Sequence, residues 1–344
     1  MQTIEAQFEI VTPMFISGAN NEADLRPPSI KGALRFWWRA LHWGQCLQDC
    51  QQDTGKALKR LHELEAELFG AAVKDDKYGQ GIFSVKLKHI QNKGIESSWP
   101  VHGLQNAGYI AYGIDATKGD KRKGVPKKPH RKGLNPTTFD LTLILKKHIT
   151  SSQKQQLEKT LLVWGLLGGL GARSRRGFGS VAIRKLDNRR FDFKEDSAYF
   201  NAIKTLLDSI VLAPEMPVFT AFNQAMKISS LLRAAKKYCD LMDILGNEYK
   251  RLRTLDEVSG TVLDRLACGL PLTGKHAKGK QYTESRRSSP VMLHVHKVGS
   301  NYIGLFSFIP AEFHPLHKQS GVLPLFKVID KHLASSDKLE NIYP

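Results

Sequence analysis

The residues with the most distinctive chemistry form a glycine- and arginine-rich stretch near the middle of the chain. Residues 168–180, GGLGARSRRGFGS, hold five glycines and three arginines within thirteen residues. Glycine permits positive φ and close approach of another backbone, and arginine presents a fixed fork of donors that suits phosphate oxygens. We therefore interpret the stretch as a loop that holds an anionic backbone, with candidate contacts at Gly169, Gly171, Arg173, Arg175 and Arg176. The alternative is a tight turn whose arginines are merely solvated.

This stretch does not have the form of a nucleotide-binding fingerprint. A dinucleotide-binding glycine motif follows a strand and opens a helix. Here a helical pattern over 155–167 comes first, and an alternating strand pattern over 180–185 follows. The chain contains no Walker A pattern either. The glycines therefore predict a loop that leads from a helix into a strand.

A second group of candidates repeats at helical spacing within residues 30–43. An apolar stripe, which should face the core, consists of Ile30, Leu34, Trp37 and Leu41. A cationic stripe begins one residue later and consists of Lys31, Arg35, Trp38 and His42, with Arg39 at its shoulder. Cations beside a tryptophan would offer phosphate contacts and a face on which a base can stack. In the alternative interpretation this side is only solvated and Trp38 belongs to a second core.

His42 invites two further interpretations. His42, Cys46 and Cys50 would share one helix face at i, i+4 and i+8, which zinc can use. No fourth ligand is evident, so we expect no metal and no other cofactor. As a general base His42 could serve RNA cleavage, but no acid–base partner stands at a suitable spacing. We therefore expect no catalytic residue and treat His42 as a phosphate contact.

The composition indicates an anionic partner. Of 344 residues, 51 are Lys or Arg and 33 are Asp or Glu, so the formal net charge is +18. Such an excess favours nucleic acid. A membrane surface is disfavoured because no long basic amphipathic helix occurs. We expect a chain without a signal peptide or membrane span, and its four cysteines are few enough to indicate a reducing cytoplasm.

The elements that must position these residues have a recognisable order in the first half. The hydrophobic pattern predicts strands at 4–11, 82–88, 139–145 and 180–185, and helices at 30–43, 57–69 and 155–167. If the second helix is an insertion, the order is that of a ferredoxin-like fold, which RNA-recognition modules share. The aromatic motifs of those modules are missing from the predicted central strands, so RNA would bind through loops and the helix face. Residues 118–133, with eight Lys or Arg, predict a mobile basic loop.

The second half is less legible. We expect a linker at 187–200, helices at 202–211, 226–253 and about 325–334, and strands at 218–222, 291–298 and 302–309. A further glycine- and lysine-rich loop, 269–280, leads to Arg286 and Arg287. The predicted fold class is α+β, with two ferredoxin-like (RRM-like) domains in tandem at 1–186 and 187–344.

Three motifs give the chain a family resemblance. Residues 30–40, IKGALRFWWRA, resemble the hallmark near the start of the Cmr subunit-one family, part of the RAMP superfamily and of type III-B CRISPR effector complexes. Residues 168–179 resemble the glycine-rich loop of the superfamily. Residues 269–271 (GLP) and 286–290 (RRSSP) resemble the signatures of its second half.

The resemblance implies a function. It implies a place at one end of a multisubunit RNA-guided complex in antiviral defence, where the chain holds the 3′ part of the guide RNA beside a related subunit. Its partners would be guide RNA, target RNA and other RAMP subunits, with no membrane involved, and Arg286 and Arg287 join the expected RNA contacts. It implies no catalysis, because target cleavage in such complexes belongs to another subunit. Two alternatives stay open: a RAMP-type endoribonuclease that processes guide RNA precursors, and a general basic RNA-binding protein.

Overall fold

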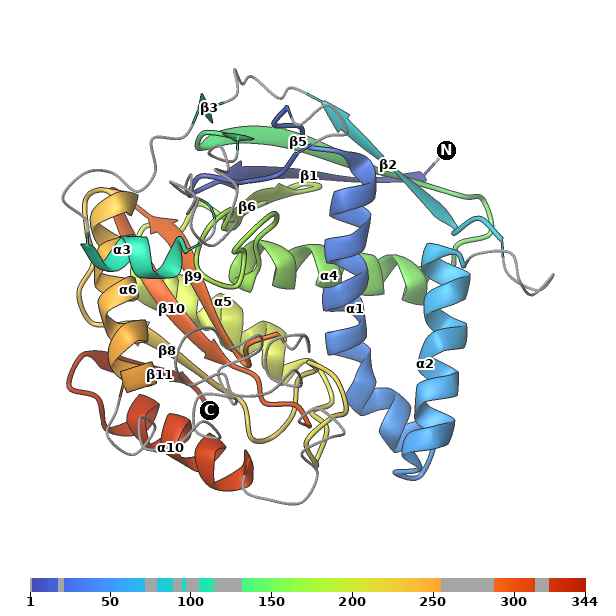
Figure 1. Cartoon of the computed structure of the whole chain (residues 1–344). Helices are drawn as coiled ribbons and strands as arrows, with labels where there is room; N and C mark the ends of the chain where they lie inside the picture. The colour runs from blue at the N-terminus through green and yellow to red at the C-terminus, as the bar shows by residue number, and fades with distance from the viewer. Residues whose placement is uncertain are drawn as a thin grey trace, which may run out of the picture.

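Two main antiparallel sheets lie side by side in the computed structural model (Figure 1). The structure describes residues 2–17, 22–71, 79–88, 95–96, 105–112, 114, 132–254, 288–312 and 322–344. Arg286, Arg287 and the predicted loop at 269–280 lie outside the described residues. Within the described ranges, no helix is long and apolar enough to cross a membrane.

The first sheet is built as the sequence predicts. Its order is β2-β5-β1-β6-β7, and its strands are β1 (Gln2–Ile10), β2 (Phe83–Lys88), β5 (Thr137–Leu145), β6 (Val181–Leu186) and β7 (Arg189–Arg190). The helices are α1 (Pro27–Asp49), α2 (Thr54–Phe69) and α4 (Ser151–Leu167), with α2 running back along α1 (Figure 1). Apart from α2 and β7, this is the strand–helix–strand–strand–helix–strand order of a ferredoxin-like unit. The predicted fold of the first half is confirmed.

The alternating sequence of β1 decides which face of the first sheet carries the helices. Ile4, Phe8 and Ile10 are fully buried, and the ring of Phe8 lies 4.7 Å from that of Trp164 in α4. The other face is polar, and Nε2 of Gln7 donates a hydrogen bond to Oδ1 of Asp140 at 3.0 Å. On this face the central strands β1 and β5 carry no aromatic side chain, in agreement with the expectation that RNA does not stack on this sheet.

The second sheet repeats the same order with later elements. Its order is β11-β8-β10-β9, and its strands are β8 (Lys227–Leu231), β9 (Val291–Val298), β10 (Asn301–Phe308) and β11 (Leu339–Tyr343). The helices are α6 (Tyr238–Thr254) and α10 (Val322–Ser335). This second unit again has the ferredoxin-like order, so the prediction of two such units is confirmed. Between the units, α5 (Asp196–Asp208) contacts α4 and β11.

Several predicted elements of the second half are wrong. The predicted helix over 226–253 is β8 followed by α6, and 218–222 contains no strand. The predicted linker 187–200 holds β7 and the start of α5. The sequence of β8 lacks strand-like alternation because both of its faces are covered, with Ser229 and Ser230 only 1% and 2% exposed.

The predicted basic loop 118–133 is described only at its end, because 118–131 lie outside the described residues. Its last two residues form β4 (Lys132–Gly133), which pairs with β3 (Ile95–Glu96). The expectation of a mobile loop is therefore wrong for these two residues. Next to them, Leu134 exchanges backbone hydrogen bonds with Met14 at 2.8 and 3.0 Å, which ties this end to the segment after β1.

The insertion between β2 and β5 links the two units. Its short helix α3 (Gln105–Ile110) lies against α6 (Figure 1). A carboxylate oxygen of Asp243 in α6 accepts hydrogen bonds from the N–H groups of Asn106 and Ala107 at 2.8 and 2.9 Å. A piece of the first half thus packs on a helix of the second. The domain boundary after residue 186 stays a prediction.

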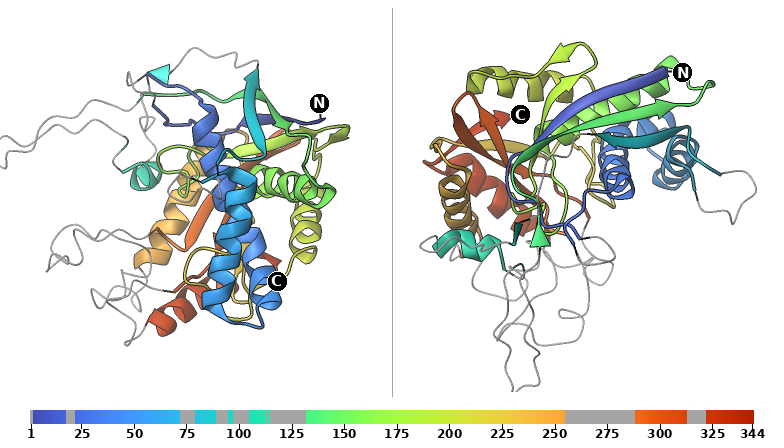
Figure 2. Two further views of the ribbon diagram at one scale, coloured as in Figure 1. Left: turned by 90° about the vertical axis from the view of Figure 1, so that its right-hand side faces the viewer. Right: turned by 90° about the horizontal axis from the view of Figure 1, so that it is seen from above.

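The hydrophobic core is continuous between the sheets. Tyr199, Phe222 and Leu305 join the side chains of β1, α1 and α4 in one buried cluster. A second cluster fills the space between β9, β10 and α6. The second sheet is therefore covered on both faces (Figure 2), so its strands offer no open surface for stacking RNA bases.

Substitution of Gly246 should loosen the contact between α3 and α6. A Cβ at this position would lie 2.3 Å from the backbone oxygen of Asn106, so Gly246→Ala must push α3 away. We expect the free energy of unfolding, measured by urea denaturation, to fall by about 1–3 kcal/mol. Gly55→Ala is the control, because a Cβ there meets nothing closer than Oδ1 of Asp53 at 3.4 Å. Equal stability of the two variants would contradict the docking of α3.

Candidate nucleic-acid interface

A basic groove lies beside the N-terminal half of α1. Its volume is about 1030 Å³, and its walls come from α1, the turn after α2 and the ends of β2 and β5. Its lining includes four cationic side chains, Lys31, Arg35, Lys146 and Lys147. The structure thus brings two predicted contacts together with two lysines that sequence reasoning did not select. Their only signal was their position directly after a predicted strand.

Lys31 and Arg35 each lie over an aromatic ring of the groove. Nζ of Lys31 is 5.3 Å from the ring centre of Phe83, and the guanidinium of Arg35 is 5.6 Å from that of Phe69. Partial burial and the nearby charges of Arg35 and Lys146 lower the pKa of Lys31. Burial is the larger cause of the lowered pKa, and the smaller contribution of Arg35 and Lys146 shows that these cations lie close enough to add to one another's positive potential. Such a potential attracts phosphate.

Part of this charge is offset by α2. Nε of Arg35 lies 3.2 Å from one carboxylate oxygen of Glu65, and Nε of Arg39 lies 3.5 Å from the other. Arg35 also donates to the backbone oxygen of Gly70 at 2.8 Å. Arg39 is not among the residues that line the groove. Arg35 is therefore partly committed to α2, while its side chain remains part of the groove lining.

The prediction that Trp38 lies on an outward-facing stripe is wrong. Trp37 and Trp38 are 3% and 0% exposed. Nε1 of Trp38 donates to Oε1 of Gln156 in α4 at 3.1 Å, and its ring lies 5.9 Å from that of Phe69 in α2. Because α2 and α4 both pack on this side of α1, Trp38 belongs to the core and no base can reach its ring.

His42 is not among the residues that line the groove. Its ring stacks on Trp38 with centroids 4.5 Å apart, and its Nδ1 donates to the backbone oxygen of Trp38 at 2.8 Å. Burial lowers the pKa of His42 to about 4. Burial also raises the pKa of Cys46 to about 11, which disfavours the thiolate that zinc requires. In the part of the chain that the structure describes, no group of three or more His, Cys, Asp or Glu could hold a metal.

The glycine-rich loop is the joint between the two units. On one side, the N–H groups of Ala172 and Gly179 donate to the backbone oxygens of Phe15 and Pro13 at 2.7 and 2.9 Å. A Cβ at Gly179, whose φ is +59°, would lie 2.0 Å from the backbone oxygen of Leu170, so only glycine fits there. On the other side, the backbone of Arg175 is hydrogen-bonded to β9.

Two of the three loop arginines are directed at the second unit. The backbone oxygen of Arg175 accepts from the N–H of Leu293 at 3.1 Å, and its Nη1 donates to the backbone oxygen of Ser289 at 2.8 Å. The guanidinium of Arg176 lies 4.0 Å from the ring centre of Tyr249. The loop therefore meets the RRSSP motif at Ser289. Phosphate contact by these arginines stays a prediction, favoured most at the exposed Arg173, whose φ is +62°.

A smaller hollow lies between the loop and α1. Its volume is about 280 Å³, and its lining includes Ala33, Phe36 and Trp37 of α1 and Gly168, Gly169, Gly171 and Arg175 of the loop. The guanidinium of Arg175 is 5.2 Å from the ring centre of Phe36. The hollow and the basic groove use different residues, and hence different faces, of the same helix. The predicted contacts on α1 and those in the glycine-rich loop therefore lie on two sides of α1 and do not form one surface.

Comparison with known proteins supplies the family. The sequence model of the RAMP superfamily matches residues 7–182, which is more than half of the chain and runs from β1 through the glycine-rich loop. The chain belongs to the RAMP superfamily.

Cmr1 subunits are among the proteins to which the chain is similar. The CRISPR system Cmr subunit Cmr1-1 of Pyrococcus furiosus is 24% identical over 334 residues, which cover 92% of this chain and 87% of the relative. The crystal structure of Cmr1 from Pyrococcus furiosus in the apo form aligns with a TM-score of 0.60 at 19% identity, covering 100% of this chain and 99% of that one. A chain of the type III-B Cmr-beta complex bound to cognate target RNA aligns with a TM-score of 0.59 at 13% identity, covering 96% and 99%. The resemblance drawn from the motifs is confirmed.

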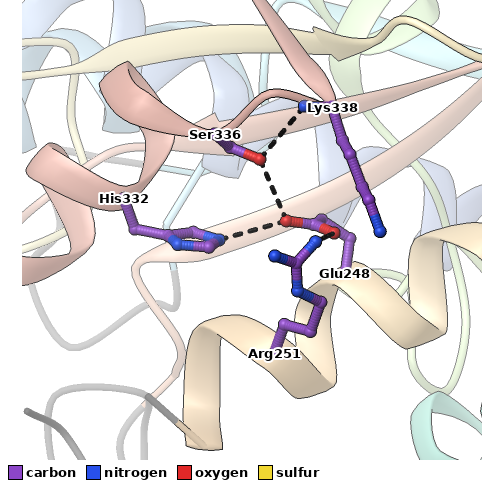
Figure 3. Close-up of polar contacts among 5 residues, drawn as sticks. All are labelled: Glu248, Arg251, His332, Ser336 and Lys338. Atoms are coloured by element: carbon purple, nitrogen blue, oxygen red, sulfur yellow. Dashed lines mark hydrogen bonds and ion pairs between the residues drawn. The ribbon is translucent and has the colours of Figure 1, made fainter. Parts of the chain in front are cut away.

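A polar cluster that sequence reasoning missed joins the two helices of the second unit of this RAMP chain (Figure 3). Oε1 of Glu248 in α6 lies 3.2 Å from both Nε2 of His332 and Oγ of Ser336, and Oε2 lies 3.1 Å from Nη1 of Arg251. Burial raises the pKa of Glu248, but the hydrogen bond from His332 and the charge of Arg251 outweigh it, so the pKa is lowered. The cluster ties α6 to α10, and none of its residues lines the groove or the hollow.

Trp37→Ala and Trp38→Ala should destabilise the protein by similar amounts. Both side chains are buried, and truncation of a buried tryptophan costs about 3–5 kcal/mol. Urea unfolding of each single variant measures the loss. Nearly wild-type stability of the Trp38 variant would contradict the burial of Trp38 and would favour an outward-facing side chain.

Glu248→Gln should destabilise the protein in a pH-dependent way. Because folding lowers the pKa of Glu248, its contribution to stability is complete above the ordinary carboxylate range and is lost as the pH falls through the folded-state pKa. We expect a loss of about 1–3 kcal/mol at neutral pH and convergence with wild type in acid. Urea unfolding across this pH range is the measurement. A difference that stays constant with pH would mean that the charge of Glu248 contributes nothing.

Proposed function

We propose that this RAMP protein is the subunit-one component of a type III-B CRISPR effector complex, in which it binds RNA without cleaving it. The single observation that carries the RNA-binding role is the groove beside α1, where Lys31, Arg35, Lys146 and Lys147 meet. The net charge of +18 and the similarity to Cmr1 chains support the same proposal. A type III-B chain of this fold is known in a complex bound to target RNA.

The groove suits a phosphate backbone. Its cations can contact phosphates, which adds affinity without choosing a sequence. A protein that serves an RNA-guided complex needs this property, because base pairing reads the sequence and the protein holds the backbone. The apolar rings of Phe69 and Phe83 beside the cations provide a less polar floor that strengthens the electrostatic attraction.

A binding role without catalysis is supported by the condition of His42. His42 was the candidate general base. In the structure it is hydrogen-bonded to the backbone oxygen of Trp38 and does not line the groove. Burial lowers its pKa to about 4. A general base must reach the proton that it removes. The endoribonuclease alternative therefore loses its candidate general base.

The finer assignments extend the family resemblance. We propose that the chain holds the 3′ part of the guide RNA at one end of the complex, beside another RAMP subunit, and that it acts in the cytoplasm. The cysteines Cys46, Cys50 and Cys239 are free thiols, which is compatible with a reducing compartment.

A double substitution in the groove tests the RNA-binding role. Lys31→Ala with Lys146→Ala should weaken the binding of unrelated single-stranded RNAs to similar degrees. The slope of log affinity against log salt should fall by about 1.4, since each phosphate contact contributes about 0.7 for single strands. Fluorescence anisotropy with labelled RNA at several salt concentrations measures both quantities.

The matched control is Lys59→Ala with Lys204→Ala, which removes the same charge from exposed positions on α2 and α5. This control should leave the slope nearly unchanged. An equal fall in both double variants would mean that net charge, not the groove, binds RNA. The recovered RNA should be intact, and cleavage that disappears in His42→Ala would replace the proposal with the endoribonuclease alternative.

A further inference from the structure

Gly32 is a glycine in an exposed part of a helix interior, and the packing of the described residues gives no reason for it. It lies in the second turn of α1, and apart from its chain neighbours and the nearby backbone of α1 no atom of the described residues comes within 4 Å of the place where its Cβ would be. Glycine weakens a helix relative to alanine. A glycine with free space around it in a helix therefore lowers stability without a gain in packing.

Three glycines deeper inside helices have a packing reason, whereas Gly55 in the first turn of α2 does not. A Cβ would lie 2.0 Å from the oxygen of Val211 at Gly44, 2.5 Å from Cβ of Ile183 at Gly165 and 2.3 Å from the oxygen of Asn106 at Gly246. Each of these glycines lets another part of the chain approach the helix closely. By the same physical logic, Gly32 leaves room for something that approaches α1 from outside the described chain.

The position of Gly32 between two hollows indicates what approaches. Its neighbours Lys31 and Arg35 line the basic groove, and its neighbours Ala33 and Phe36 line the hollow at the glycine-rich loop. Cations stand on both sides, with Arg175 against Phe36 at 5.2 Å. A chain that passed from one hollow to the other would cross the exposed face of α1 at Gly32.

We propose that a single RNA strand takes this path: its backbone crosses α1 in contact with Gly32, between phosphates held in the groove and a base placed against Phe36 in the hollow. This inference rests on the proposed RNA-binding function and adds the route of the strand. The cations favour RNA over a polypeptide as the crossing chain, because Lys31, Arg35 and Arg175 attract phosphates on both sides of the crossing point. The base would meet a partly exposed aromatic ring, to which any base can stack.

Side chains added at Gly32 test the crossing. Gly32→Ala and Gly32→Gln should leave the melting temperature of the free full-length chain unchanged or raise it, because alanine and glutamine are better helix formers. The same variants should weaken the binding of a labelled single-stranded RNA of mixed sequence, slightly for alanine and by at least about tenfold for glutamine, equivalent to about 1.4 kcal/mol. Gly55→Ala and Gly55→Gln, at an exposed position near the start of α2, are the matched controls and should bind RNA as the wild type does.

The outcomes separate this inference from the function on which it rests. If Gly32→Gln binds RNA normally while Lys31→Ala with Lys146→Ala does not, the crossing is wrong and the RNA-binding function stands. If neither variant changes RNA binding, both proposals fail. A lower melting temperature of Gly32→Gln would mean that Gly32 is needed for the stability of the free chain, and it would overturn the proposed crossing of RNA over α1. If Gly32 instead accommodates a neighbouring polypeptide, Gly32→Gln should bind RNA with normal affinity, and this result would also overturn the crossing.

Discussion

The backbone pairing of the glycine-rich loop with both units is the interaction on which the rest of the structure depends. The loop donates to Phe15 and Pro13 after β1 and accepts from Leu293 in β9. Oγ of Ser180, at the end of the loop, accepts from the N–H of Val295 at 3.1 Å. Buried backbone groups need such partners, and the loop provides them both for the segment after β1 and for a strand of the second sheet. Positive φ at Gly171, Gly177 and Gly179 lets the chain turn tightly enough to reach both.

Two buried histidines complete this joint as neutral groups. Nδ1 of His294 in β9 donates to the backbone oxygen of Gly168 at 2.9 Å, so its Nε2 is left to accept from Nδ1 of His296 at 3.3 Å. Burial lowers the pKa of His294 to about 3, because a charged imidazolium in this interior would lose its hydration. His296 in turn stacks on Tyr199 of α5, with ring centroids 4.0 Å apart. The end of α4, the second sheet and α5 are thereby fixed to one another.

This arrangement leaves helix and loop surfaces, not sheet faces, for a nucleic acid. The second sheet is covered on both sides, and the open face of the first carries residues such as Glu5 and Asp140 rather than aromatic rings. The N-terminal half of α1 lies between the edge of the first sheet and the glycine-rich loop. Lys31 and Arg35 of the first motif and Arg175 of the loop therefore lie around one helix, although they are more than one hundred residues apart in the sequence.

The sequence by itself determined the units of the fold and the segments that carry the candidate site. Alternation in β1 and β5, helical spacing in α1 and the density of glycine in 168–180 are local patterns. Each reflects a periodicity or a backbone preference that neighbouring residues set among themselves. The strand β8 and the start of α6 were missed because a strand covered on both faces loses its alternation.

Only the tertiary structure decided what covers the second stripe of α1 and what the loop arginines contact. The spacing in α1 separated two stripes, but nothing local revealed that α2 and α4 would cover the second and bury Trp38. Likewise, the number of arginines in the loop was plain, whereas the contacts of Arg175 with Ser289 and of Arg176 with Tyr249 join residues far apart in the chain. Periodicity reports that a side chain shares a face with its neighbours, but burial and pairing depend on what packs against that face, and this is fixed by contacts between distant segments.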